Sequence, residues 1–336
     1  MSEESHSGGH SHSHGGHSHG HGVENAQGFT AQGPAAQLSP LEEASIQSVS
    51  GQQRVLYLDC QSGIAGDMFV GALIDLGVPV AVLEEAIHGL GLDGIRYEIL
   101  RGYSGAISTL KFNVFEETKQ PARSFAQIRT LLQKSALSKA VVERALRIFE
   151  RLGRAEAKVH DTTLEEVEFH EVGAVDSIVD IVGAAALLDW LDACVVVSPL
   201  PISRGYVECQ HGRIPLPAPA TLLCLEGLAI VDSGLECELV TPTGAAIVGA
   251  EAQVSGGFPA MQVQALGWGA GQRGLGDRPN ALRVVLGVKP TSQEEQTSSA
   301  TGRETLPLIL GETNLDDESP ECIAFTIEAL LNAGAL

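Results

Sequence analysis

Histidine and acidic side chains crowd one short stretch of the chain, between residues 160 and 180. The stretch contains His160, Glu165, Glu166, Glu168, His170, Glu171, Asp176 and Asp180. Imidazoles and carboxylates bind divalent metal ions and transfer protons. The stretch therefore predicts a site that handles a metal and moves protons. Its candidate metal ligands are His160, His170, Asp176 and Asp180, and its candidate catalytic groups are His170, Glu171, Asp176 and Asp180.

Asp176 and Asp180 are four residues apart in a segment made otherwise of Ser, Ile, Val, Gly and Ala. On a helix, residues at this spacing share a face. A carboxylate among apolar neighbours is costly unless it is paired or bound to a metal, which favours a functional interpretation. In the structural alternative, Asp176 caps the helix, Asp180 faces solvent and His170 is an ordinary half-buried histidine.

A glycine-rich turn at residues 59–68 joins an apolar strand to a helix. It has neither the lysine of a phosphate-binding loop nor the glycine spacing of a dinucleotide fingerprint. Asp59 and Asp67 flank the turn as candidate catalytic groups, and this arrangement favours a cation or a cation-bridged anion. The turn also offers Ser62, Gly63 and Gly66 as candidate substrate-binding residues, because backbone amides at a helix start can hold an anion. The alternative is that Asp67 only caps the helix.

Positive groups and hydroxyls further along the chain form a second set of candidate substrate-binding residues. Arg204, His211 and Arg213 surround an expected hairpin, and Thr241 and Thr243 open a helix. Together they could hold a phosphate-bearing ligand. Thr-Pro-Thr-Gly is also common capping chemistry, so this alternative remains open.

The first 21 residues hold 7 of the chain's 11 histidines: His6, His10, His12, His14, His17, His19 and His21. Their spacing on a Gly/Ser chain lets several imidazoles wrap one Ni(II), Zn(II) or Cu(II) ion, and composition does not decide among these metals. The tail could equally be an affinity tag or a neutral linker. We take six of these residues, from His10 to His21, as candidate metal ligands.

Composition limits the partners of the chain. Its 42 acidic and 21 basic residues give a formal net charge of -21, which disfavours nucleic acids and anionic membranes because their phosphates would be repelled. No run of about eighteen apolar residues and no signal sequence are found, so we expect a cytoplasmic protein. The six cysteines form no C-x-x-C pair, which fits neither a disulfide framework nor a structural zinc site.

Hydrophobic periodicity predicts strands alternating with helices, and therefore an α/β fold, with a mixed α+β fold as the variant. The architecture expected is a layered core of sheet and helices. Strands are expected at 55–58 and 195–197, hairpins at 95–100 with 110–114 and at 205–216, and helices at 68–76, 80–88, 178–191, from Ser138 onward, from Thr221 and near Gly244.

Four segments are expected along the chain. Residues 1–52 have hardly any large apolar residue and should be a disordered, metal-binding tail. Residues 53–288 form the core, and the polar residues 289–305 form a linker. Residues 306–336 hold one strand at 306–310 and one helix at 320–332, which cannot enclose a core and read as the start of an incomplete α+β module.

Several long motifs, in this order, resemble the LarC family of nickel insertion proteins. The motifs are LDCQSGIAGDMFVGAL, EVEFHEVGAVDSIVDIVGA, SPLPISRGYVECQHGRIPLPAPAT and ELVTPTGAA, supported by GWGAG and RPNALR. The resemblance runs from residue 54 to the last residue. It implies a lyase, a nickel chelatase that inserts Ni(II) into pyridinium-3,5-bisthiocarboxylic acid mononucleotide and forms nickel–sulfur and nickel–carbon bonds.

The resemblance also implies partners and roles. In the family, CTP is hydrolysed with Mn(II) or Mg(II), and the product is the nickel-pincer cofactor of lactate racemase, so apo lactate racemase or a related enzyme would be the acceptor; a homo-oligomer is compatible with the family. Nickel becomes the expected metal of the tail. Mapped by motif, the resemblance points to Asp59, Ser62 and Asp67, to His160, His170, Glu171, Asp176 and Asp180, and to Arg204, His211 and Arg213 as the residues that face the anionic substrate.

The sequence departs from the family's motif near the C-terminal end of the chain. Glu318 and Ser319 stand where the family has Met and Thr, and the nucleotide-binding region expected next does not follow, so the CTP site is expected outside this chain. Two alternatives to a chelatase stay open. One is a nickel store or metallochaperone in which the tail does most of the binding, and the other is a metal-dependent phosphohydrolase.

Overall fold

The computed structural model describes residues 29–34, 53–118, 120–169, 175–209, 212–289 and 319–333. The chain divides into two units, Met1–Thr291 and Ser292–Leu336. The histidines of the tail, the strand expected at 306–310 and the linker beyond Lys289 lie outside the described residues. The first unit contains all of the candidate site residues that the structure describes.

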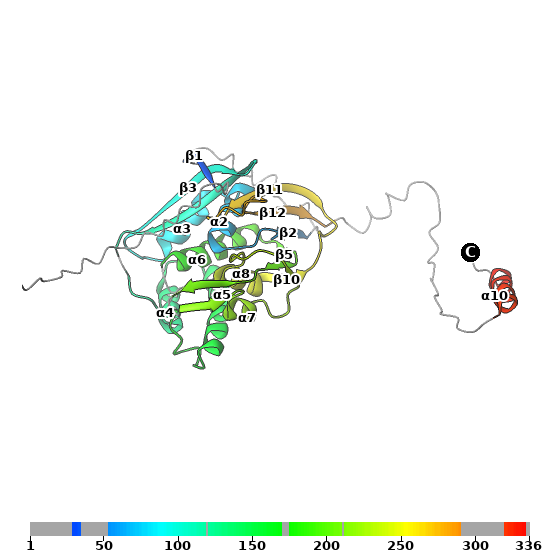
Figure 1. The fold of residues 1–336 in the computed structure, drawn as a ribbon. Coiled ribbons are helices and arrows are strands. Elements are labelled where there is room, and N and C mark those ends of the chain that lie inside the picture. The colour runs from blue at the N-terminus through cyan, green and yellow to red at the C-terminus, as the bar shows by residue number, and fades with distance from the viewer. Residues whose placement is uncertain are drawn as a thin grey trace, which may run out of the picture. The chain divides into compact units, whose positions relative to one another are not determined.

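One mixed sheet organises the first unit (Figure 1). The pairs β1–β3, β3–β4, β11–β12 and β12–β2 are antiparallel, whereas β4 pairs with β11 in parallel, and β2, β5 and β10 run parallel to one another. This arrangement confirms the mixed α/β class, the strands expected at 55–58 and 195–197, and the hairpin of β3 with β4. Across the sheet the strands are β1 (Thr30–Pro34), β3 (Ile95–Ser104), β4 (Ile107–Glu116), β11 (Gln262–Ala270), β12 (Ala281–Val288), β2 (Arg54–Asp59), β5 (Cys194–Val197) and β10 (Ala252–Ser255).

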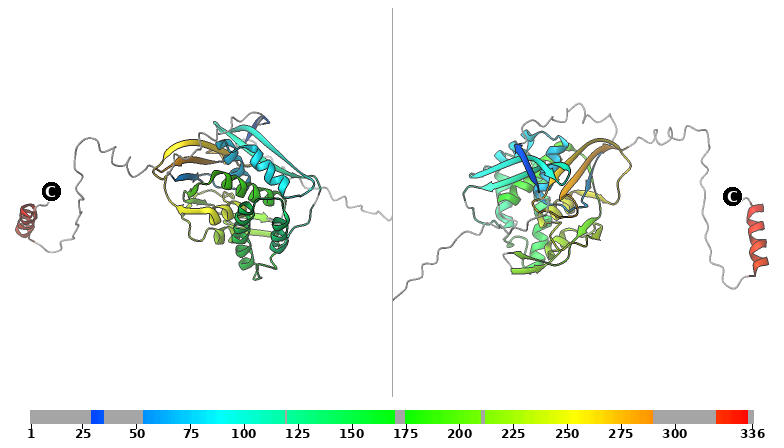
Figure 2. Two further views of the ribbon diagram at one scale, coloured as in Figure 1. Left: turned by 180° about the vertical axis from the view of Figure 1, so that it is seen from behind. Right: turned by 45° about the horizontal axis from the view of Figure 1, so that its top comes forward.

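Helices stack in layers on this sheet, as the views of Figure 2 also show. Helix α2 packs against β4, β11 and β12, α6 packs on α2 and α3, and α5 packs on α6 and α8. The expected helices are all present, and Ser138 caps α5 by accepting a hydrogen bond from the Val141 amide. The helices are α2 (Gly66–Leu76), α3 (Val80–Gly89), α4 (Phe125–Lys134), α5 (Lys139–Val159), α6 (Val175–Leu191), α7 (Pro219–Cys224) and α8 (Pro242–Glu251).

Two features of the sequence fix α2 and α6 in the core. Helix α6 is apolar on nearly every face, which is the pattern of a helix buried between other elements. Helix α2 approaches the sheet closely because β11 has a glycine at position 269, where a Cβ atom would lie 1.8 Å from the Met68 carbonyl oxygen. Burial therefore holds α6 in the core, and the close approach to β11 holds α2 against the sheet.

The expectation that all of residues 1–52 are disordered is wrong for β1. This strand pairs antiparallel with β3, Thr30 opposite Tyr103 and Pro34 opposite Leu100. Backbone hydrogen bonds to an edge strand do not require an apolar sequence, so composition could not reveal this pairing. Gly102 of β3 makes room for it, because a Cβ atom there would lie 2.3 Å from the Thr30 carbonyl oxygen.

Two small sheets complete the first unit. Strands β6 (Leu200–Ile202) and β9 (Ile230–Asp232) pair in parallel, and β7 (Tyr206–Cys209) and β8 (Gly212–Pro215) form the hairpin expected at residues 205–216. Helix α7 starts at Pro219, two residues before the expected Thr221, because proline is favoured in the first turn of a helix.

In the second unit, the helix expected at 320–332 is confirmed as α10 (Pro320–Asn332). Ser319 caps it by accepting a hydrogen bond from the Cys322 amide, 3.3 Å away. None of its residues is buried, and Phe325 is 73% exposed. Within the described ranges, no helix has the length and apolar character that a membrane crossing requires.

Candidate functional site

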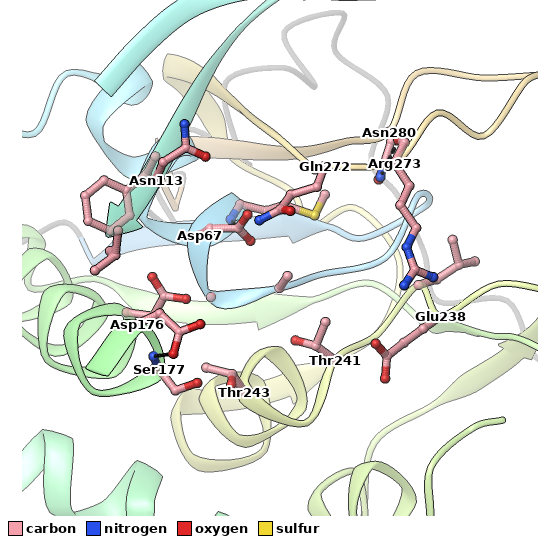
Figure 3. A pocket seen from close by; sticks show the side chains of 18 of the residues that line it. Asp67, Asn113, Asp176, Ser177, Glu238, Thr241, Thr243, Gln272, Arg273 and Asn280 are labelled. Atoms are coloured by element: carbon pink, nitrogen blue, oxygen red, sulfur yellow. Dashed lines mark hydrogen bonds between the residues drawn. The ribbon is translucent and has the colours of Figure 1, made fainter. Parts of the chain in front are cut away.

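A cavity of about 550 Å³ opens where α2, α6 and α8 begin (Figure 3). Strand β4 and the loop between β11 and β12 supply the remaining walls. The polar side chains that line the cavity are Asp67, Asn113, Asp176, Ser177, Asp180, Glu238, Thr241, Thr243, Gln272, Arg273 and Asn280. The structure thus brings together Gly66, Asp67, Asp176, Asp180, Thr241 and Thr243 of the predicted site residues.

Backbone hydrogen bonds place the starts of α2 and α8 side by side. The amide of Ile64 donates to the Leu239 carbonyl at 2.9 Å, and the amide of Thr241 donates to the Ile64 carbonyl at 3.1 Å. Gly63 has φ +93°, and a Cβ atom there would lie 2.0 Å from the Leu239 oxygen. The glycine-rich turn and the Thr-Pro-Thr-Gly segment are therefore one local structure, although about 180 residues separate them in the sequence.

Asp67 and Asp180 are joined at the start of α2. The backbone amide of Asp67 donates a hydrogen bond to the Asp180 carboxylate, and the amide of Met68 donates to the Asp67 side chain at 2.8 Å. Ala65, the N-cap residue, makes no side-chain hydrogen bond to the helix. Both carboxylates therefore satisfy backbone donors at a helix N-terminus, where negative charge is favoured.

The three aspartates of the cavity all have pKa values above the ordinary range. Loss of hydration raises the pKa of Asp67 and of Asp176. Burial also raises the pKa of Asp180 well above its usual value, and the charges of Asp67 and Asp176 raise it further. Lys111 opposes the effect at Asp67, because its positive charge favours the ionised carboxylate. These carboxyl groups therefore hold protons more tightly than exposed aspartates do.

The loop between β11 and β12 contributes residues that the sequence analysis did not select. Gln272, Arg273 and Asn280 line the cavity, and Asn113 lines it from β4. The Asn280 side chain donates to the Arg273 carbonyl at 2.9 Å, which holds the loop closed. The sequence signals for the loop residues are that Gln272 and Arg273 directly follow the GWGAG motif and that Asn280 belongs to the RPNALR motif.

Asp59 and Ser62 do not line the cavity. Asp59 is 6% exposed and accepts a hydrogen bond from Arg283 Nε at 2.9 Å, so it forms an ion pair between neighbouring strands. The Ser62 hydroxyl donates to the Pro279 carbonyl at 2.7 Å, which ties the glycine-rich turn to the loop of Arg273. The contacts of Asp59 and Ser62 therefore link elements of the fold.

Arg204 and Arg213 also lie outside the cavity lining. Arg204 forms an ion pair with Asp232, and Arg213 lies 3.9 Å from Glu208 and over the ring of Tyr206. His211 falls outside the described residues. The structure thus separates the predicted arginines from the predicted carboxylates.

His160 lines a second, smaller cavity of about 280 Å³ together with Thr162, Glu166, Val167 and Glu168. Its Nε2 atom lies 3.5 Å from Glu156. His170 and Glu171, which precede α6, lie outside the described residues, as do His10 and the other tail histidines. The described residues therefore do not join His160 to the cavity of Asp176 and Asp180.

Across the described ranges, no three His, Cys, Asp or Glu side chains lie close enough together to hold a metal ion. The three aspartates share one cavity without forming a closed coordination shell. A divalent cation bound there would need further coordinating atoms, either from a bound small molecule or from other residues.

The fold and the cavity define a mixed α/β protein with an acidic ligand pocket that also presents one arginine. The chain belongs to the nickel insertion protein family, whose model matches residues 56–336. The resemblance noted in the sequence is thus confirmed.

Relatives named for nickel insertion match over most of their length. The one from Syntrophotalea carbinolica is 47% identical over 283 residues, which are 84% of this chain and 70% of the relative. Those from Geotalea daltonii and Geobacter metallireducens are 44% and 46% identical, over 84% of this chain and 71% of each relative. No solved structure matches the chain.

Proposed function

We propose that this protein inserts Ni(II) into pyridinium-3,5-bisthiocarboxylic acid mononucleotide and so forms the nickel-pincer cofactor of lactate racemase. The observation that carries the proposal is the cavity of Asp67, Asp176 and Asp180 in a member of the nickel insertion family. Oxygen ligands from carboxylates bind Ni(II) without holding it as tightly as thiolates would. Nickel is the substrate metal of the proposed reaction.

An incomplete protein site suits the insertion reaction. The pyridinium substrate supplies two thiocarboxylate sulfurs and one ring carbon as ligands, so the protein needs to add few. Asp176 and Asp180 lie on one face of α6 and line the cavity. We assign them to the nickel ion as it arrives, and they release it when the substrate's softer sulfur atoms take over.

Formation of the nickel–carbon bond requires a base. The electron pair of the ring C–H bond becomes the carbon–nickel bond, the proton leaves, and the metal stays Ni(II), so no oxidant or reductant is needed. A carboxylate whose pKa is raised by burial is a stronger base than an exposed one. Asp67 and Asp180 both have raised pKa values and are joined through a backbone hydrogen bond, so we assign the proton to this pair.

The family resemblance adds CTP hydrolysis with Mn(II) or Mg(II), and delivery of the product to apo lactate racemase or a related enzyme. The described residues offer no preformed cluster for such a metal. Nickel binding and proton transfer in the proposed reaction use only the protein's own side chains and the nickel that is its substrate. CTP dependence and the acceptor enzyme remain part of the proposal through the family alone.

A nickel store is the second candidate, favoured by the seven histidines in the first 21 residues. Deletion of residues 1–28 separates the two functions and leaves β1 in place. If the cavity inserts nickel, the shortened chain retains a Ni(II) site in equilibrium dialysis, and Asp176→Asn or His170→Ala weakens it. If the protein is a store, nearly all nickel binding disappears with the tail.

A matched control comes from the same acidic stretch. Glu165 is exposed and forms an ion pair with Arg129 at 2.6 Å, outside the cavity. Glu165→Gln removes one carboxylate charge, as Asp176→Asn does, and should leave nickel binding by the shortened chain unchanged. An equal loss in both variants would mean that net charge rather than the cavity holds the metal.

A further inference from the structure

The two ends of the cavity differ in chemistry (Figure 3). Asp67 and Asp176 lie at one end, and Arg273 lies at the other, near Thr241. Among the described residues that line the cavity, Arg273 is the only one with a positive charge. A ligand that carries a cation at one end and an anion at the other would complement this arrangement.

Several contacts hold the loop of Arg273 at the cavity. Asn280 donates its side-chain amide to the Arg273 carbonyl and accepts the Gly271 amide on its own carbonyl, each at 2.9 Å. The Ser62 hydroxyl donates a hydrogen bond to the carbonyl of Pro279, the residue before Asn280. The backbone that carries the guanidinium is therefore fixed, while the side chain itself is exposed to the cavity.

Hydroxyls at the start of α8 also line the cavity, and in Figure 3 Thr241 lies toward Arg273 whereas Thr243 lies toward Ser177 and Asp176. Thr241 accepts the Gly244 amide at 3.1 Å and so caps the helix. Thr243 lies in the first turn of α8, lines the cavity and is only 8% exposed as a residue.

Glu238 lines this end as well and lies beside Arg273 in Figure 3. Its negative charge would compete with an anionic ligand for the guanidinium. The arginine therefore favours a group with more charge than a single carboxylate, such as a phosphate monoester dianion, which also accepts paired hydrogen bonds from a guanidinium.

We propose that Arg273 binds the phosphate monoester of the mononucleotide substrate, so that the pyridinium ring points toward Asp67 and Asp176. This inference rests on the proposed function. It assigns the phosphate contact to Arg273 rather than to Arg204 or Arg213, the arginines that the sequence predicted. Arg273 is thus a specificity-determining residue that distinguishes a mononucleotide from the corresponding nucleoside.

The test uses nicotinic acid mononucleotide, a pyridinium mononucleotide without thiocarboxylates, and its nucleoside, which lacks the phosphate. Calorimetric titration of the full chain should show that Arg273→Ala lowers affinity for the mononucleotide about tenfold to hundredfold, the effect of losing a hydrogen-bonded charge. Affinity for the nucleoside should not change. Arg273→Lys should restore part of the lost affinity, and Glu238→Gln should raise affinity above that of the wild type.

Arg278→Ala is the matched control, because Arg278 belongs to the same loop but pairs with Asp277 at 2.6 Å and does not line the cavity. It should bind the mononucleotide as the wild type does. Equal affinity of the wild type and Arg273→Ala, including no measurable affinity of either, would overturn the assignment.

Nickel titrated without nucleotide separates this inference from the proposed function. Arg273→Ala should bind Ni(II) as the wild type does. If the cavity binds no nickel while Arg273→Ala still loses the mononucleotide, the nickel function fails and the phosphate assignment stands. If nickel binds normally and Arg273→Ala does not change the affinity for the mononucleotide, only the assignment of Arg273 to the phosphate fails.

Discussion

The backbone amide of Asp67, in the first turn of α2, donates a hydrogen bond to the carboxylate of Asp180, in the second turn of α6. A carboxylate from another helix thus helps to cap α2. Because both residues line the cavity, the same contact that stabilises the helix start also fixes the position of the acidic groups.

Gly66→Ala should disturb this contact. A Cβ atom at position 66 would lie 2.5 Å from Asp180 Oδ2, so the carboxylate must move. We expect a loss of about 1–3 kcal/mol in the free energy of unfolding, measured by urea denaturation, together with weaker nickel binding by the cavity. Gly256→Ala is the control, since an added Cβ atom there meets nothing within 4 Å. Unchanged stability and nickel affinity in Gly66→Ala would show that the contact is unimportant.

Asp180 should make stability depend on pH. Its pKa is raised in the folded state, so the folded protein holds the proton more tightly than the unfolded chain does. In the absence of metal, the free energy of unfolding should therefore fall as pH rises from the ordinary aspartate pKa, about 4, through the raised value. Asp180→Asn removes this contribution and should be more stable than the wild type at neutral pH but not at pH about 4. Parallel stability curves for the two proteins would contradict the raised pKa.

Asp59→Asn should affect stability rather than nickel binding. The buried carboxylate pairs with Arg283, whose side chain is 36% exposed. Removing one partner of a buried ion pair is strongly destabilising, and partial hydration of the remaining arginine reduces the loss here to about 1–3 kcal/mol. Denaturation and nickel titration of the same samples check this. A stable variant that binds nickel poorly would instead support a direct role for Asp59 at the metal.

Arg204→Ala and Arg213→Ala should leave mononucleotide affinity within about twofold of the wild type. Both side chains are exposed and pair with surface carboxylates, and such pairs contribute little to stability. Calorimetric titration beside Arg273→Ala makes the comparison direct. A tenfold loss of affinity in either variant would place the anion contact at the hairpin of β7 and β8.

The part of the site that depends on local periodicity was predictable from the sequence. Asp176 and Asp180 share a helix face because they are four residues apart, and the structure places both at the cavity. The glycine-rich turn was also recognisable, since glycines and an aspartate at the end of an apolar strand mark a helix start.

The remainder depends on contacts between distant parts of the chain. Arg273 and Asn280 reach the cavity only because β11 and β12 pair with each other and α2 packs on them. Asp59 pairs with Arg283, 224 residues away. Neither relationship leaves a repeating pattern in the sequence, so residue types alone could not separate Arg273 from Arg204 or Asp59 from Asp67.

The insertion reaction itself shows most directly whether this chain inserts nickel. The purified chain is incubated with Ni(II), pyridinium-3,5-bisthiocarboxylic acid mononucleotide and CTP with Mg(II), and the nickel-containing product is detected by absorbance and mass spectrometry. We expect product with the wild type and a loss of about tenfold or more with Asp176→Asn and Asp180→Asn, because each removes a carboxylate from the cavity. No product from the wild type, even when the C-terminal portion of a longer relative is added, would contradict the proposed function.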